Sequence, residues 1–87
     1  MRDIQEIGEQ ANRARVHLLF VDAQMALTML DLADLSQVEE LRDRRINTAL
    51  KAYSYIRDCL PNVSLTPAED SALNKRMAEL KLRLSFS

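Results

Sequence analysis

The chain has 87 residues, of which 47% are hydrophobic and 29% are charged, and its formal net charge at pH 7 is −1. This length allows one small domain over residues 1–87 with a thin core, and this composition argues against disorder. A charge so close to zero provides no strong field toward nucleic acid or an acidic lipid surface.

The first predicted element is a long helix over residues 2–33. One glycine and two prolines leave the chain few places to turn, and strand-like alternation never extends over a useful length. The N-terminal stretch MRDIQEIGEQ is charged and amphipathic and lacks the apolar core of a signal peptide. A helix of this length spans about 45 Å, so we expect its first two turns to project beyond its shorter partners.

The most apolar stretch of the chain is VHLLFVDAQMALTMLDLADL, residues 16–35. It could be a membrane span, a buried helix or part of an interface. Asp22 and Asp31 would each cost roughly 2.5–3.5 kcal/mol at the centre of a bilayer, which argues against a span. On a helical wheel, the polar residues of the whole helix form one stripe less than about 90° wide. Two neighbours from the same chain cannot easily cover the remaining surface, which favours a homodimer.

The residues expected to meet a second copy, or a protein or peptide partner, are apolar. Most lie on the first helix and two lie near the C-terminus. They are Leu19, Phe20, Met25, Ala26, Met29, Leu30, Leu82 and Phe86.

The second predicted helix covers residues 37–60. The sequence SQVE, from Ser36 to Glu39, has the pattern of a capping box, and Pro61 cannot continue a helix beyond Leu60. The short connection before Ser36 forces the first two helices to run antiparallel.

A polar pair is expected within this hairpin. If the chain turns near Leu35, Arg45 lies near Ala26, one helical turn from Asp22, and a partly buried Asp22–Arg45 pair becomes possible. Alternatively, Arg45 extends to the solvated edge of the bundle.

The third predicted helix covers residues 67–84. The sequence TPAE, from Thr66 to Glu69, is a second capping-box pattern with Pro67 at the first helical position. The linker PNVSLT is long enough to reverse the chain again. The sequence therefore predicts an antiparallel three-helix bundle with one long N-terminal helix.

No residue pattern points to catalysis, to a cofactor or to a metal site. His17 is the single imidazole, and the bulky residues after it do not match the lysine and glycine that usually follow a phosphotransfer histidine. Cys59 would need a base to act as a nucleophile, and it is expected to lie nearer residues 11–13. A second His or Cys that could complete a metal shell is missing. Both residues are interpreted as structural or solvated.

Basic residues gather in RDRR, from Arg42 to Arg45, and between Lys75 and Arg83. Acids interrupt both clusters, and no aromatic residues alternate with them for base stacking. Solvated helix faces explain them better than nucleic-acid contacts. A nucleic-acid-associated regulatory protein that uses the arginines of the second helix remains the alternative function.

The register Ala49-x3-Tyr53-x2-Ile56-x4-Pro61 resembles the second helix and closing proline of a tetratricopeptide repeat. The first-helix pattern of that family is absent upstream. The resemblance implies a tetratricopeptide-like helical hairpin that binds peptides or partner helices and does no chemistry. Ala49 would be its close-packing position and Tyr53 its anchor against the neighbouring helix.

Together these observations predict a small interaction or scaffold module that self-associates through its long first helix and is not an enzyme. A single cysteine cannot form an internal disulfide, which favours a reducing, cytoplasmic setting.

Overall fold

The computed structural model describes residues 4–85 and the side chains of residues 8–85. This part of the chain contains α1 (Ile4–Leu35), α2 (Glu39–Cys59), a short 3-10 turn η1 (Leu60–Asn62) and α3 (Pro67–Ser85), without any strand. The all-α prediction is confirmed. The expected helix bounds on described residues are wrong by at most two residues. The expected start at residue 2 lies outside the described part.

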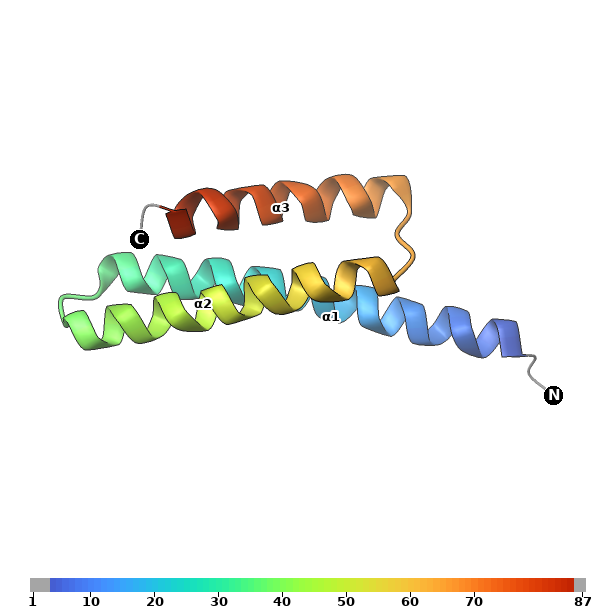
Figure 1. Cartoon of the computed structure of the whole chain (residues 1–87), viewed down its shortest axis with the longest axis horizontal. Helices are drawn as coiled ribbons and strands as arrows, with labels where there is room; N and C mark the ends of the chain where they lie inside the picture. Colours follow the sequence, from blue (N-terminus) through green and yellow to red (C-terminus); the bar gives the residue numbers. More distant parts are fainter. Residues whose placement is uncertain (1–3, 86–87) are drawn as a thin grey trace.

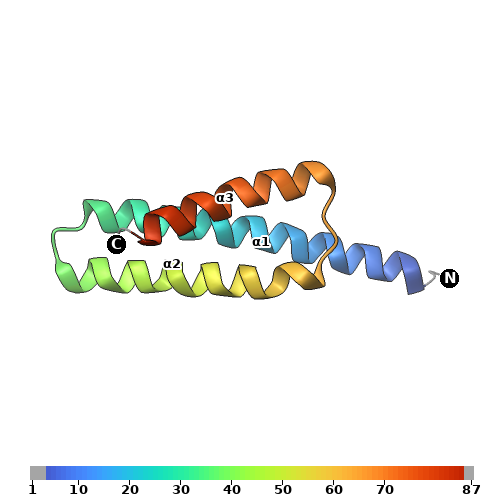
Figure 2. The ribbon, with the colours of Figure 1, turned by 45° about the horizontal axis from the view of Figure 1, so that its top comes forward.

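Each helix reverses the direction of the one before it (Figures 1 and 2). α1 and α2 lie side by side over the length of α2, and α3 packs on one side of this hairpin. The N-terminal part of α1 projects beyond the other helices and makes the molecule elongated, with extents of 56 × 23 × 17 Å. The reason is length, because 32 residues rise about 48 Å and the 21 residues of α2 only about 32 Å.

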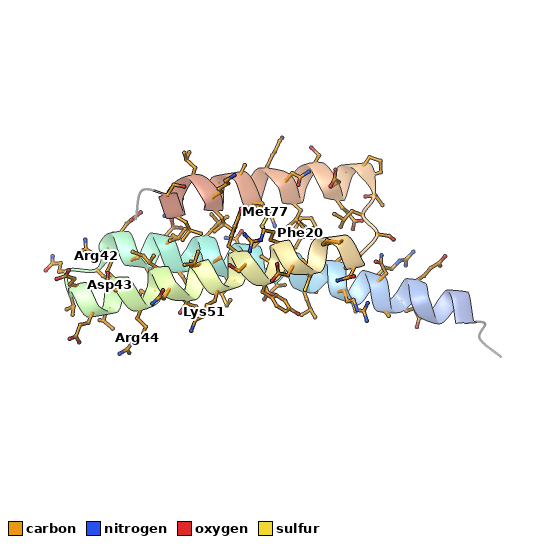
Figure 3. All side chains as sticks on the ribbon, in the orientation of Figure 1. Phe20, Arg42, Asp43, Arg44, Lys51 and Met77 are labelled. Atoms are coloured by element: carbon orange, nitrogen blue, oxygen red, sulfur yellow. The ribbon has the colours of Figure 1, made fainter. Side chains whose placement is uncertain are left out.

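The core runs along the seam where the three helices meet. α1 buries one stripe of residues at spacings of three and four, which keeps them on one side of a helix. The largest fully buried side chains are Ile56 of α2 and Leu73 and Leu80 of α3. Met77 of α3 belongs to the core cluster, and Phe20 of α1 packs against this cluster (both labelled in Figure 3). The buried residues of the core cluster are Leu19, Ala23, Ala26, Leu27, Leu30, Ala49, Ile56, Leu73, Met77 and Leu80.

The turn between α1 and α2 corrects the predicted capping box at Ser36. The Ser36 hydroxyl donates to the carbonyl of Leu32 at 2.9 Å, and the Ser36 N–H donates to the carbonyl of Ala33 at 3.1 Å. Ser36 thus satisfies carbonyls at the end of α1, which have no partner inside the helix. α2 begins after Val38, which offers no side-chain cap, and Glu39 is its first residue.

The capping box at the start of α3 is confirmed. The Thr66 N–H donates to Glu69 Oε1 at 3.0 Å, and the Glu69 N–H donates to Thr66 Oγ1 at 3.2 Å. Two further bonds hold the preceding linker against α1. Asn12 Nδ2 donates to the Ser64 carbonyl at 2.9 Å, and the Ser64 N–H donates to Asn12 Oδ1 at 2.7 Å. These bonds fix where α3 starts.

The far end of α3 is tied to α1 by Arg83. Its guanidinium lies 2.9 Å from Asp31 and 3.1 Å from Asp34. Burial lowers the pKa of Arg83, but the bonds to these two carboxylates outweigh it and leave the pKa above its usual value. The two carboxylates are exposed, so the ion pairs orient α3 more than they stabilise it.

Candidate interaction surface

Three of the predicted interface residues belong to the core. Leu19 and Leu30 are 2% exposed, and Ala26 is fully buried. They face α2 and α3 within the same chain, so they cannot meet a partner. The interface prediction is corrected at these positions.

The other predicted interface residues divide into three groups. Phe20 and Met29 are half-buried and pack against the core, and the guanidinium of Arg76 lies 5.1 Å from the centre of the Phe20 ring. Met25 of α1 and Leu82 of α3 are exposed, by 40% and 60%. Phe86 lies outside the described residues. Met25 and Leu82 are therefore the predicted positions that remain open to a partner.

α1 carries a continuous exposed stripe in addition to its core stripe, and the sequence alone did not distinguish the two. All of its members are exposed, and they follow one another at alternating spacings of three and four. Those spacings define one seam of a coiled coil. The sequence carries Ile4 and Ile7 at the next two positions of the same spacing. We name the outer stripe as Ala11, Ala14, Leu18, Val21, Met25, Thr28, Leu32 and Leu35.

Thr28 is the single polar member of the outer stripe. Its hydroxyl donates to the carbonyl of Gln24 at 3.0 Å, so this polar group is satisfied within α1. A partner helix could cover Thr28 without leaving its hydroxyl unpaired. The outer stripe can therefore be buried along its length.

A shallow groove of about 460 Å³ adjoins the outer stripe where α1 leaves α2. Leu18 of the outer stripe lines it together with Arg15, Tyr55 and Cys59. A hydrogen bond with the side chain of Cys59 raises the pKa of Tyr55, and the charge of Cys59, desolvation and the carboxylate of Asp22 act in the same direction. Arg15 opposes this effect on the pKa of Tyr55. Arg15 and Asp22 therefore both lie along the edge of α1 that faces Tyr55.

The structure does not bring Asp22 and Arg45 together. The Arg45 guanidinium donates to the Leu32 carbonyl at 3.1 Å and also to the Ser36 hydroxyl. The ion pairs of the described residues do not include an Asp22–Arg45 pair. The physical reason is the turn, because α1 continues to Leu35 and shifts the pairing of the two helices by several residues. Arg45 consequently lies opposite Leu32 and not opposite Ala26.

The three arginines near the start of α2 differ in their surroundings. Arg45 is engaged at the α1–α2 turn. Arg42 and Arg44 are exposed with Asp43 between them, near the turn (Figure 3). Alternating charges of this kind are typical of a solvated helix face.

His17 and Cys59 differ in their exposure to solvent. His17 is exposed on α1. Cys59 is a half-buried free thiol beside Arg15, Leu18 and Tyr55, several residues further along α1 than the sequence analysis expected. Within the described residues, no three side chains of His, Cys, Asp or Glu are grouped as a metal site would require.

One part of α1, Gly8–Leu35, is long and apolar enough to cross a membrane by length and composition alone. Of its most apolar window, 39% is buried inside the molecule. The core helix of a small bundle passes the same test, so this finding leaves the absence of a membrane partner as a prediction.

Comparisons of the chain with protein-family models, with curated proteins and with solved structures found no match. The outer stripe and its surroundings are therefore the features of the chain that bear on its function.

Proposed function

We propose that the chain is a small interaction module, an antiparallel three-helix bundle that associates with a second copy of itself through α1. The observation that carries this proposal is the exposed outer stripe of α1. Seven of its eight residues are apolar, and they extend over most of the longest helix. On this proposal the module performs no catalysis and takes no cofactor.

A second copy is the partner that the chemistry of the outer stripe supports. Residues at alternating spacings of three and four fit into the gaps of a matching helix, and an identical stripe is available on every other copy. A continuous apolar surface of this length is also costly to leave in water. The tetratricopeptide-like character of the α1–α2 hairpin belongs to the same proposal, with a peptide or protein helix as a further partner.

A cytoplasmic setting completes the proposal. Cys59 is a free thiol in the folded chain, which a reducing compartment would preserve.

Size-exclusion chromatography with light scattering tests the proposal. We expect the wild-type chain to show twice the 10.0 kDa mass of one chain. Leu18→Glu should give a monomer, because a carboxylate in the centre of the seam would be buried without a partner. Leu50→Glu is the matched control, since Leu50 of α2 is exposed to a similar extent, 46% against 55%, and lies outside the outer stripe.

Two results would contradict the proposal. One is a wild-type chain that stays monomeric at the highest concentration reached. The other is a Leu50→Glu variant that dissociates as readily as Leu18→Glu, because the outer stripe would then not be the contact.

A further inference from the structure

We infer, on the basis of the function proposed above, that the two copies pack α1 against α1 in opposite directions along their full length. Leu18 of each copy then lies opposite the partner's Val21, and the twofold axis passes between these two positions.

The area of contact favours overlap along the whole helix. A helix about 48 Å long and about 10–12 Å wide offers about 500 Å² per copy, or about 1,000 Å² in all, where specific interfaces begin. Overlap restricted to residues 18–35 would bury only about 600 Å² in total, which is typical of crystal-packing contacts. The projecting part of α1 is therefore needed in the interface.

The sizes of the side chains favour opposite directions. The outer stripe begins with Ala11 and Ala14 and ends with larger residues. In a parallel pair each alanine would face an alanine, and the helices would have to separate again further along. In the antiparallel pair Ala14 faces the partner's Met25, and Ala11 faces the partner's Thr28. Small residues opposite large ones keep the two helix axes at an even distance.

The charges beside the outer stripe agree with this direction. Arg15 and Asp22 both lie on the edge of α1 next to Tyr55, and neither belongs to an ion pair of the described residues. The antiparallel pair places Arg15 of each copy across from the partner's Asp22, twice in the dimer. A parallel pair would place Arg15 across from Gln10. It would also place Asp22 across from His17, so that Arg15 and Asp22 would not face each other in the parallel pair.

The projecting end of α1 gains a neighbour in the antiparallel pair. Within one chain, α2 runs beside α1 only from about Leu18 onward, because Cys59 at its end lies beside Leu18. In the antiparallel pair the partner's α2 runs beside the other half of α1. Each copy thus supplies the side support that the other lacks.

Cross-linking through the single native cysteine tests the inference. In the antiparallel pair the two Leu18 residues are offset by only about 4.5 Å along the helices, so the adjacent Cys59 thiols flank the twofold axis on the same side. In a parallel pair the two α2 helices lie on opposite sides of the α1 pair, with the thiols roughly 20 Å apart. We expect a short bismaleimide to yield a covalent dimer, and neither Cys59→Ser nor Leu18→Glu to yield one.

Charge reversal is the second arm of the test. Arg15→Asp and Asp22→Arg should each weaken the dimer on the order of tenfold, because each places like charges together twice. The double variant should return to within about threefold of the wild-type dissociation constant. Leu18 and Cys59 remain unchanged in these variants.

The outcomes separate the inference from the proposed function. A dimer by light scattering without a Cys59 cross-link, or without rescue in the double variant, would overturn the antiparallel arrangement and leave self-association standing. A wild-type monomer would overturn both.

Discussion

Arg45 supplies a positive charge to the C-terminal end of α1, although it belongs to α2. The last turn of α1 contains no basic residue of its own, and its carbonyls have no further partners inside the helix. Arg45 donates to the Leu32 carbonyl and to the Ser36 hydroxyl, and Ser36 itself donates to the same carbonyl. One side chain thus holds the end of one helix against the start of the next.

Replacing Arg45 by alanine should lower the free energy of unfolding by about 1–2 kcal/mol, because two charge-assisted hydrogen bonds and a favourable charge at a helix end are lost. Urea unfolding followed by circular dichroism measures the change. Arg44→Ala is the control and should stay within about 0.5 kcal/mol of wild type, since Arg44 is exposed. Equal effects of the two substitutions would refute the proposed role of Arg45.

At the level of single residues, the sequence could indicate that Arg45 lies on the inner side of α2 but could not name its partner. That partner depends on where α1 ends. Ser36 was expected to start α2, whereas its side chain completes α1. Serine forms comparable local hydrogen bonds at either helix end, and the presence of Arg45 thirteen residues from Leu32 favours this one. A choice set by a distant side chain cannot be made from local sequence.

At the level of elements, α1 packs against both other helices and still exposes an apolar stripe. The sequence showed correctly that most of the circumference of α1 is apolar. A helical wheel could not indicate which part of that surface packs against α2 and α3 and which part stays exposed. The inner stripe containing Leu19 and Leu30 and the outer stripe containing Leu18 and Met25 have the same spacing and similar residues. Their division follows from the positions of α2 and α3. A test for a second unbroken series of threes and fours would have found the outer stripe.

The start of α3 depends on the reciprocal bonds between Thr66 and Glu69. Thr66→Ala should destabilise the chain by about 1 kcal/mol, because the Glu69 N–H loses its acceptor. The midpoint of thermal unfolding measures this change. Ser71→Ala, on the exposed side of the same helix, should be neutral or slightly stabilising, because alanine has the higher helix propensity. A neutral Thr66→Ala would show that the linker bonds of Asn12 suffice to start α3.

At the level of the whole molecule, α3 is held to α1 at both ends. Near its start, the Asn12–Ser64 bonds fix the linker, and at its end Arg83 joins Asp31 and Asp34. α3 covers one side of the α1–α2 hairpin, and the outer stripe stays uncovered. The fold therefore keeps one long surface available.

Self-association would make thermal stability depend on concentration. We expect the unfolding temperature to rise by about 3–5 °C for each tenfold increase in protein concentration, because mass action favours the folded dimer. Calorimetry at several concentrations measures the slope. Leu18→Glu should remove the dependence, and Leu50→Glu should keep it. An unfolding temperature that is the same at every concentration would speak against a dimer.

The amide of Asn12 meets the backbone of Ser64 as another peptide group would, giving and receiving one hydrogen bond. This pair of hydrogen bonds is sensitive to deamidation of Asn12. Hydrolysis of the amide to a carboxylate would exchange a donor nitrogen for an oxygen and set a negative charge against the Ser64 carbonyl. One of the two bonds would become a repulsion, so a change of a single functional group, with almost no change in shape, would loosen the linker and the helix that follows it.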